Sequence, residues 1–281
     1  FPVHESLRRR LTAEVHLHLP ESYVVFARGA VERAGEGWRI SHTEPISDLN
    51  FVAAPGLEVR SFQDDAEVVR VAGKGLDSGP AEDIAREVHW LLRWYNDAFG
   101  SAAPEHELAL VLRPLDGGLP GYARPGYIAL HVGDDFADGR AEYLQFFAHE
   151  VSHLWWSKGS PVGFENWLNE SFAEYSSMLA ARAKGHSEYF DSLVARKRTK
   201  SQGMPPVIGV ERTDPNAHTV FYTKGCLILH ELEERMGDGP FIEWLGLLVE
   251  REVGSTDELL IALEEHSGPE TAGWLEAKLL E

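Results

Sequence analysis

The stretch that says most about the fold is His149-Glu150-Val151-Ser152-His153, in a segment predicted to be helical. Residues four apart on an α-helix share one face, so two imidazoles at this spacing can both reach a single ion. A carboxylate one residue after the first histidine can contact a water molecule on that ion and take its proton. The pattern therefore predicts a metal site with His149 and His153 as ligands and Glu150 as the proton-transfer residue.

A five-residue pattern of this kind also arises by chance in a chain with 13 histidines, and on a charged helix it would be a surface patch. Here Phe146-Phe147 precede the pattern and Leu154-Trp155-Trp156 follow it. Such apolar surroundings predict a largely buried helix. Buried imidazole and carboxylate groups are costly without a partner, which favours a metal site over a surface patch.

A third ligand is expected on the next predicted helix, where Trp167-Leu168-Asn169-Glu170 stands near the start. Catalytic zinc takes three protein ligands and one water. The short connection at 158–163 allows the two helices to run antiparallel, so that Glu170 faces the two histidines. Glu174, one turn further on, could accept the outer N–H of a liganding imidazole. The alternative for both glutamates is an ordinary solvated position on a helix.

The first part of the chain has the alternation and turn residues typical of β-structure. A Gly/Ser/Asp-rich stretch at 73–80 then marks a boundary, and a helix with apolar residues at helical spacing follows at 81–99. Two apolar strands come next, with a Gly/Pro-rich loop at 116–126 between them. Strands are expected at 13–19, 23–27, 37–41, 48–53, 67–72, 108–112 and 127–132.

The sequence after residue 139 is typical of helices. Ser255 and Glu258 form the Ser-x-x-Glu pattern of a capping box at the start of the last clear helix, and Asp214-Pro215 suits the start of another. We therefore predict an α+β fold, with a β-rich N-terminal domain at 1–75 and a mostly helical domain at 76–281. Helices are expected at 140–156, 165–184, about 214–236, 240–253 and from 255.

Composition narrows the possible functions. The formal net charge of −19 argues against a nucleic-acid partner, because phosphates call for clustered Lys and Arg. No apolar run approaches the roughly 18–20 residues that a membrane-spanning helix needs. Cys226 is the only cysteine, so no intramolecular disulfide is expected. The chain begins at Phe1, which indicates a processed or shortened form; compartment (cytoplasmic, periplasmic or secreted) and oligomeric state stay open.

Taken together, these residues resemble the aminopeptidase N family of gluzincin zinc metallopeptidases. That family has His-Glu-x-x-His followed by Trp-Leu-Asn-Glu-Gly-Phe-Ala-x-Tyr, usually with eighteen residues between the second His and the Glu. The second block of this chain is Trp167-Leu168-Asn169-Glu170-Ser171-Phe172-Ala173-Glu174-Tyr175, and sixteen residues separate His153 from Glu170. The resemblance covers roughly residues 80–281. It implies a thermolysin-like catalytic domain with one Zn²⁺ held by His149, His153 and Glu170, preceded by part of the family's N-terminal β-domain.

A third segment, Val220-Phe221-Tyr222-Thr223-Lys224-Gly225-Cys226, resembles the family's Val-Tyr-x-Lys-Gly-Ala block, with one residue inserted between Val and Tyr. In that family the tyrosine hydrogen-bonds the oxyanion of the tetrahedral intermediate. The resemblance therefore implies that Tyr222 is an oxyanion donor, a role that suits a phenol directed at developing negative charge.

Two larger features also depart from the family. Its exopeptidase motif, Gly-x-Met-Glu-Asn, contains a glutamate that binds the free amine of the substrate. The matching segment here, Gly121-Tyr122-Ala123-Arg124, has no carboxylate, and Arg124 would repel a cationic amine. The resemblance also places the last residues of this sequence at the end of the family's catalytic domain, so the family's C-terminal helical domain is expected to be absent.

The resemblance implies a zinc-dependent peptidase that acts on peptides or proteins, with Glu150 as general base and acid. Asn169, Tyr122 and Arg124 are further candidates for the substrate site. An aminopeptidase with an altered amine site and an endopeptidase both fit the residues. A different class also stays open, namely an idle binding domain that keeps the metallopeptidase fold, although an idle site has no need to keep Glu150.

Overall fold

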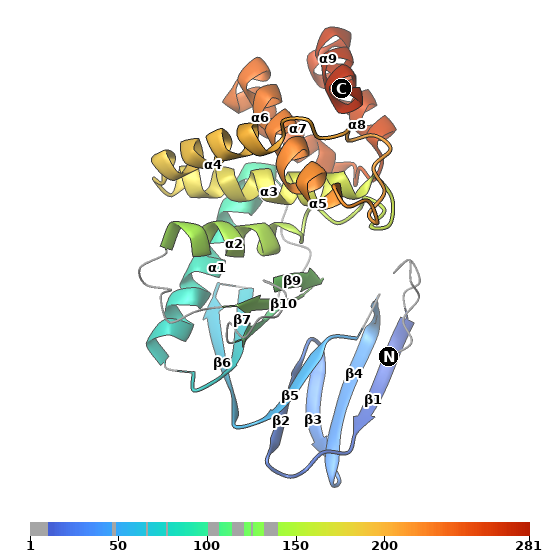
Figure 1. Cartoon of the computed structure of the whole chain (residues 1–281). Coiled ribbons are helices and arrows are strands. Elements are labelled where there is room, and N and C mark those ends of the chain that lie inside the picture. The colour runs from blue at the N-terminus through green and yellow to red at the C-terminus, as the bar shows by residue number, and fades with distance from the viewer. Residues whose placement is uncertain are drawn as a thin grey trace. The chain divides into compact units, whose positions relative to one another are not determined.

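The computed structural model describes residues 11–46, 49–65, 67–76, 78–100, 107–113, 121–124, 126–131 and 140–281. The described chain starts with β-sheets and continues with helices (Figure 1), which confirms the predicted α+β order. It divides into two compact units. The first comprises residues 1–89 and 105–138, and the second comprises residues 90–104 and 139–281.

Two small sheets stand at the start of the first unit. One has the antiparallel order β1-β4-β3, and the other pairs β2 with β5. The expected alternation is present in β1, where Ala13, Val15 and Leu17 are less exposed than the residues between them. The strands are β1 (Leu11–Leu17), β2 (Tyr23–Ala27), β3 (Ala30–Ala34), β4 (Gly37–Ile46) and β5 (Phe51–Pro55).

The other described strands of this unit form a five-stranded sheet of order β6-β7-β8-β10-β9. The inner pairs β7–β8 and β8–β10 are parallel, whereas the two edge pairs are antiparallel. β8 and β10 consist of nearly continuous buried apolar residues, as expected of strands inside a parallel sheet. The strands are β6 (Leu57–Asp64), β7 (Glu67–Lys74), β8 (Glu107–Arg113), β9 (Gly121–Arg124) and β10 (Tyr127–His131).

Three strands differ from the sequence prediction, since β3, β6 and β9 were not expected. β9 lies within the segment predicted as a loop at 116–126, part of which falls outside the described residues. All four residues of β9 are half-buried, so the strand has no apolar alternation that could reveal it. The strand expected at 48–53 begins at Phe51, and residue 48 lies outside the described residues. The domain boundary near residue 75 stays a prediction. The strand that precedes it, β7, pairs with β8, which follows it in the chain.

The second unit is helical and includes the C-terminal part of α1 (Ser78–Phe99). The predicted helices after residue 139 are present, and the Ser255–Glu258 capping box is confirmed. The helix expected from about Asp214 begins at Ala217 instead, with Asn216 as its N-cap, and contains a π-helical turn. α4 and α9 were not expected. The elements are α2 (Arg140–Ser152), α3 (Asn166–Ala183), α4 (Ser187–Lys200), α5 (Ala217–Thr219), a π-helical turn η1 (Val220–Lys224), α6 (Gly225–Met236), α7 (Asp238–Glu250), α8 (Thr256–Ser267) and α9 (Pro269–Leu280).

Helix α3 is the central element of this unit, because α2, α4, η1 and α6 all pack against it. The helices α2, α3, α4 and α6 are labelled in Figure 1. Almost its whole length is buried, including Trp167, Phe172 and Tyr175. Gly225 allows the closest approach: a Cβ at that position would stand 2.1 Å from the Ser171 Oγ. Ser171 donates to the carbonyl of Phe221 at 2.6 Å, and this contact fixes η1 on α3.

None of the described helices combines the length and the apolar character needed to cross a bilayer.

Candidate metal centre

The two histidines lie where α2 ends. His149 is in its last turn, and His153 directly follows the terminal residue Ser152. The prediction that this helix reaches residue 156 is wrong, because the chain tightens into turns in which Leu154 and Trp155 donate to the carbonyls of Val151 and Ser152. The pair nevertheless keeps the spacing of a helical face. The ring centroids are 5.0 Å apart and the ring planes lie at 87°.

Glu170 on α3 completes the cluster. Its Oε2 lies 3.7 Å from the Nε2 of His149 and 3.5 Å from the Nε2 of His153. Ligands at about 2.0–2.1 Å in a tetrahedron around zinc stand about 3.4 Å from one another, so this spacing suits a shared ion. Within the part of the chain that the structure describes, this is the one group of His, Cys, Asp or Glu with metal-ligand geometry.

The Oε2 atom of Glu170 gives an independent test of the fit. It is buried and has no hydrogen-bond partner among the described residues. A buried carboxylate oxygen without a partner is costly, and a cation between this oxygen and the two imidazoles would satisfy it. The nitrogen and oxygen donors match a zinc site.

In each of the three expected ligands, the polar side-chain atom that is not directed at the centre of the cluster has a partner of its own, as is usual for metal ligands. The Nδ1 of His149 lies 3.0 Å from the Glu174 Oε2, and the Nδ1 of His153 lies 3.0 Å from the carbonyl oxygen of Trp156. The other oxygen of Glu170 accepts from the Asn166 Nδ2 at 3.5 Å and lies 3.8 Å from an Arg212 nitrogen. Both Nε2 atoms are thereby left for an ion.

The electrostatics of the cluster favour positive charge at its centre. Burial lowers the pKa of His149, but the carboxylates of Glu170 and Glu174 outweigh it and raise this pKa to about 10. Burial would raise the pKa of Glu170, yet its interactions with the two imidazoles hold it well below the usual range. A metal ion would take the place of the proton that these carboxylates attract.

Glu174 is itself held by a buried cation that the sequence prediction did not include. Lys197 on α4 donates to the Glu174 Oε1 at 2.5 Å, and Gln145 donates to the Oε2 at 3.1 Å. Burial acts to raise the pKa of Glu174, but the charge of Lys197 and the contact with His149 lower it to about 2. Glu174 is therefore an anion that faces the Nδ1 of His149, and that contact orients the imidazole.

Tyr222 lies next to the cluster, on the π-helical turn η1. Its ring stacks on His149 with centroids 5.5 Å apart and on His218 with centroids 4.5 Å apart. Burial and the charge of Glu170 raise the Tyr222 pKa well above its usual range, so the hydroxyl remains a hydrogen-bond donor. Single π-helical turns often occur at functional positions.

Glu150 is also in this region. It is buried, and its negative charge contributes to the raised pKa of both His149 and Tyr222. The structure thus brings Glu150 together with the predicted ligands and Tyr222, while the catalytic roles of these residues stay predictions. Arg212 and His218 were not predicted, because neither belongs to a recognisable motif.

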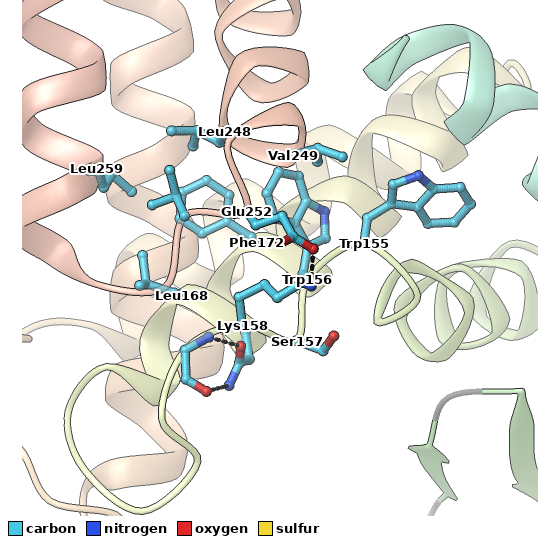
Figure 2. Close-up of a pocket in the computed structure, with 13 residues that line it drawn as sticks. Trp155, Trp156, Ser157, Lys158, Leu168, Phe172, Leu248, Val249, Glu252 and Leu259 are labelled. Carbon is cyan, nitrogen blue, oxygen red and sulfur yellow. Dashed lines mark hydrogen bonds and ion pairs between the residues drawn. The ribbon is translucent and has the colours of Figure 1, made fainter. Parts of the chain in front are cut away.

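Asn169 has a different surrounding from its neighbour Glu170. Its side chain accepts from the backbone N–H of Gly159 and donates to the carbonyl of Gly159, both at 3.0 Å. Asn169 lines a pocket with Trp156 and Phe172, and Figure 2 shows the ion pair of Lys158 and Glu252 at the same pocket. The contacts indicate that Asn169 fixes the α2–α3 connection; its part in a substrate site stays a prediction.

Tyr122 and Arg124 lie on β9 in the first unit. The Arg124 guanidinium stands over the Tyr122 ring, 5.5 Å from its centroid. Their predicted place in the substrate site stays a prediction.

Comparison with solved structures identifies a common fold. The chain matches no family model and no curated protein. Its fold is that of the M1 zinc metallopeptidases. The M1 zinc metallopeptidase from Deinococcus radiodurans is 22% identical with a TM-score of 0.74, over 96% of this chain and 64% of that one.

The matching structures include variants of such enzymes with bound ligands. A two-domain M1 zinc metallopeptidase variant bound to L-tryptophan is 21% identical with a TM-score of 0.73, over 97% of this chain and 64% of that one. A Deinococcus radiodurans M1 zinc metallopeptidase variant bound to a Tyr-Ser-Ala substrate is 22% identical with a TM-score of 0.73, over 96% of this chain and 64% of that one. This chain thus spans 64% of the length of these neighbours, and at this identity the likeness concerns the fold.

Proposed function

We propose that this chain is a zinc-dependent peptidase with one Zn²⁺ held by His149, His153 and Glu170. The observation that carries the proposal is the convergence of two imidazole Nε2 atoms on the buried Glu170 Oε2, at 3.7 and 3.5 Å. The shared fold with M1 zinc metallopeptidases supports the same conclusion. Peptides or proteins are the proposed substrates.

The residues around the ion divide the chemistry among them. Bound zinc polarises a carbonyl and lowers the pKa of a water molecule. Glu150 takes the proton of the attacking water and passes it to the leaving amine. The Tyr222 hydroxyl donates to the oxygen of the scissile carbonyl as negative charge develops there. Glu174 holds the Nδ1 proton of His149, so that the Nε2 lone pair faces the ion.

Replacement of Glu150 tests this division directly. Glu150→Gln keeps the size and polarity of the side chain but removes its basicity, so hydrolysis should fall by about 10²–10⁴-fold while zinc stays bound. Glu188→Gln, an exposed change on α4, is the matched control and should leave both unchanged. Turnover that survives in Glu150→Gln would rule out the proposed role of this residue.

The specificity is proposed to differ from that of an ordinary aminopeptidase. Ala123 and Arg124 stand where the family has its amine-binding carboxylate, so the chain offers no negative charge to a free amino terminus at those two positions. This observation favours an endopeptidase or an aminopeptidase that anchors the amine through another carboxylate. An idle binding domain is the remaining alternative, and it predicts bound zinc without cleavage of any peptide.

A further inference from the structure

Lys197 is a buried lysine that the chemistry proposed above does not use. It is 7% exposed and lies on α4 in line with Phe190, Leu193 and Val194, the other buried residues of that helix. A lysine in this position must lose its hydration, which is costly unless its ammonium group is paired. Its partners therefore indicate why the position is charged.

The ammonium group of Lys197 joins two parts of the metal centre. It donates to the Glu174 Oε1 at 2.5 Å and to the backbone carbonyl of Tyr222 at 2.8 Å. The other oxygen of Glu174 lies 3.0 Å from the Nδ1 of His149. One cation thus contacts the carboxylate that orients a predicted ligand and the turn that carries the predicted oxyanion donor.

The π-helical turn makes the second contact important. In η1 the N–H of Gly225 bonds to the carbonyl of Val220, five residues back, so the ladder of α-helical bonds is interrupted here. The Lys197 ammonium group holds the Tyr222 carbonyl on this irregular turn, and the Tyr222 ring stacks on His149 at 5.5 Å. α4 packs against both α3 and η1, so the lysine reaches both elements from a third one.

We propose that Lys197 is a positioning residue that couples the orientation of His149, through Glu174, to the placement of Tyr222. The inference rests on the proposed function for its catalytic part, but its effect on metal affinity does not need peptide hydrolysis. An ordinary buried ion pair would contribute to stability alone. A positioning residue also alters zinc affinity and kcat in a protein that remains folded.

Zinc affinity of the metal-free protein, measured by competition with a chromophoric chelator, is the primary test. Lys197→Met should weaken zinc binding by up to about 10–100-fold, the usual effect of losing an outer partner of a metal ligand, because Glu174 is that partner and Lys197 holds it in place. Lys197→Arg keeps the charge and should recover most of the affinity. Lys200→Met, on the exposed side of the same helix, is the matched control and should bind zinc like the unmodified protein.

A double-variant cycle separates positioning from general stability. If Lys197 acts through Glu174, the combined change Glu174→Gln with Lys197→Met should weaken zinc binding no more than the stronger single change. Independent, multiplying effects would overturn the coupling. So would a folded Lys197→Met protein, checked by circular dichroism, with unchanged zinc affinity.

Kinetics test the second contact. With saturating zinc, Lys197→Met should lower kcat for a peptide while KM changes little, because the Tyr222 turn acts on the transition state. If Lys197→Met does not fold, Lys197→Arg and Lys197→Gln replace it. Zinc affinity that is retained in the arginine variant and lost in the glutamine variant supports the proposal. Equal zinc affinities of the two variants overturn it. If the unmodified protein cleaves no peptide, the proposed function fails while the zinc measurements still decide the coupling to His149.

Discussion

Removal of the Tyr222 hydroxyl is the change whose effect can be worked out most fully from the structure. Tyr222→Phe deletes one oxygen and keeps the ring, which is stacked on His149 at 18° and on His218 at 11°. The carbonyl contact with Lys197 comes from the backbone and also remains. The variant should therefore fold normally and bind zinc as tightly as the unmodified protein.

The expected loss is confined to the transition state. Removing one donor to a developing oxyanion costs about 10²–10³ in kcat, or about 2.7–4 kcal/mol. In the resting site the negative charge of Glu170 already acts on the hydroxyl, and only interactions that strengthen in the transition state count toward rate. We therefore expect the lower end of this range, a decrease in kcat of about a hundredfold.

The pH profile gives a second sign of the same role. Because the Tyr222 pKa is raised well above its usual range, the phenol stays in its neutral donor form throughout the pH range of the assay. Ionisation of Tyr222 should therefore not produce an alkaline loss of activity, and Tyr222→Phe should lower the rate without changing the shape of the profile.

Steady-state kinetics on zinc-loaded protein, with metal content measured in parallel, provide the assay. Tyr23→Phe on β2, in the other compact unit, is the matched control and should keep full activity. A fully loaded Tyr222→Phe enzyme whose kcat stays within about threefold of the unmodified value would refute the oxyanion role.

Three further predictions concern the metal, the cysteine and the specificity. A chelator should lower the melting temperature of the protein. Zinc at a hundredfold excess over its Kd stabilises the folded state by about 2.7 kcal/mol, and each kcal/mol shifts the melting temperature by about 2–4 °C in a unit of this size. A melting temperature that does not change with zinc would contradict a metal site in the folded protein. Burial raises the pKa of Cys226 to about 12, so at pH 8 only about one thiol in ten thousand is ionised. Iodoacetamide should therefore label Cys226 only after unfolding, as mass spectrometry would show. Rapid labelling of the native protein would contradict the burial of this thiol. N-acetylated and free peptides of one sequence should be cleaved at similar rates if no carboxylate anchors the amine, whereas a strong preference for free amines would mean that a residue other than those at 123–124 binds it.

Much of the fold could be predicted because the patterns that specify it are local. The capping box at Ser255 and the buried runs of β8 and β10 depend on residues close in sequence. β9 could not be predicted, since its pairing with β10 is a main-chain interaction and its four residues show no alternation. α4 has the buried spacing of a helix at 190, 193, 194 and 197, but the last of these positions is lysine, which interrupts the apolar pattern.

The candidate site divides in the same way. The grouping of His149, His153 and Glu170 followed from two motifs on consecutive helices, and the structure brings these side chains together. Lys197 and Arg212 could not be assigned from sequence, because their contacts with Glu174 and Glu170 come from segments that only the tertiary packing brings near. A lysine in the apolar face of a helix is nevertheless a signal that a buried anion lies opposite.

The central claim is that the cluster of His149, His153 and Glu170 holds zinc for peptide hydrolysis. The most direct measurement is digestion of a peptide library by the zinc-loaded protein, with and without a chelator, read by mass spectrometry. We predict new termini with zinc, none with the chelator, and their return when zinc is restored. One zinc ion bound per chain with no cleavage of any peptide would contradict the claim and leave a binding domain with the metallopeptidase fold.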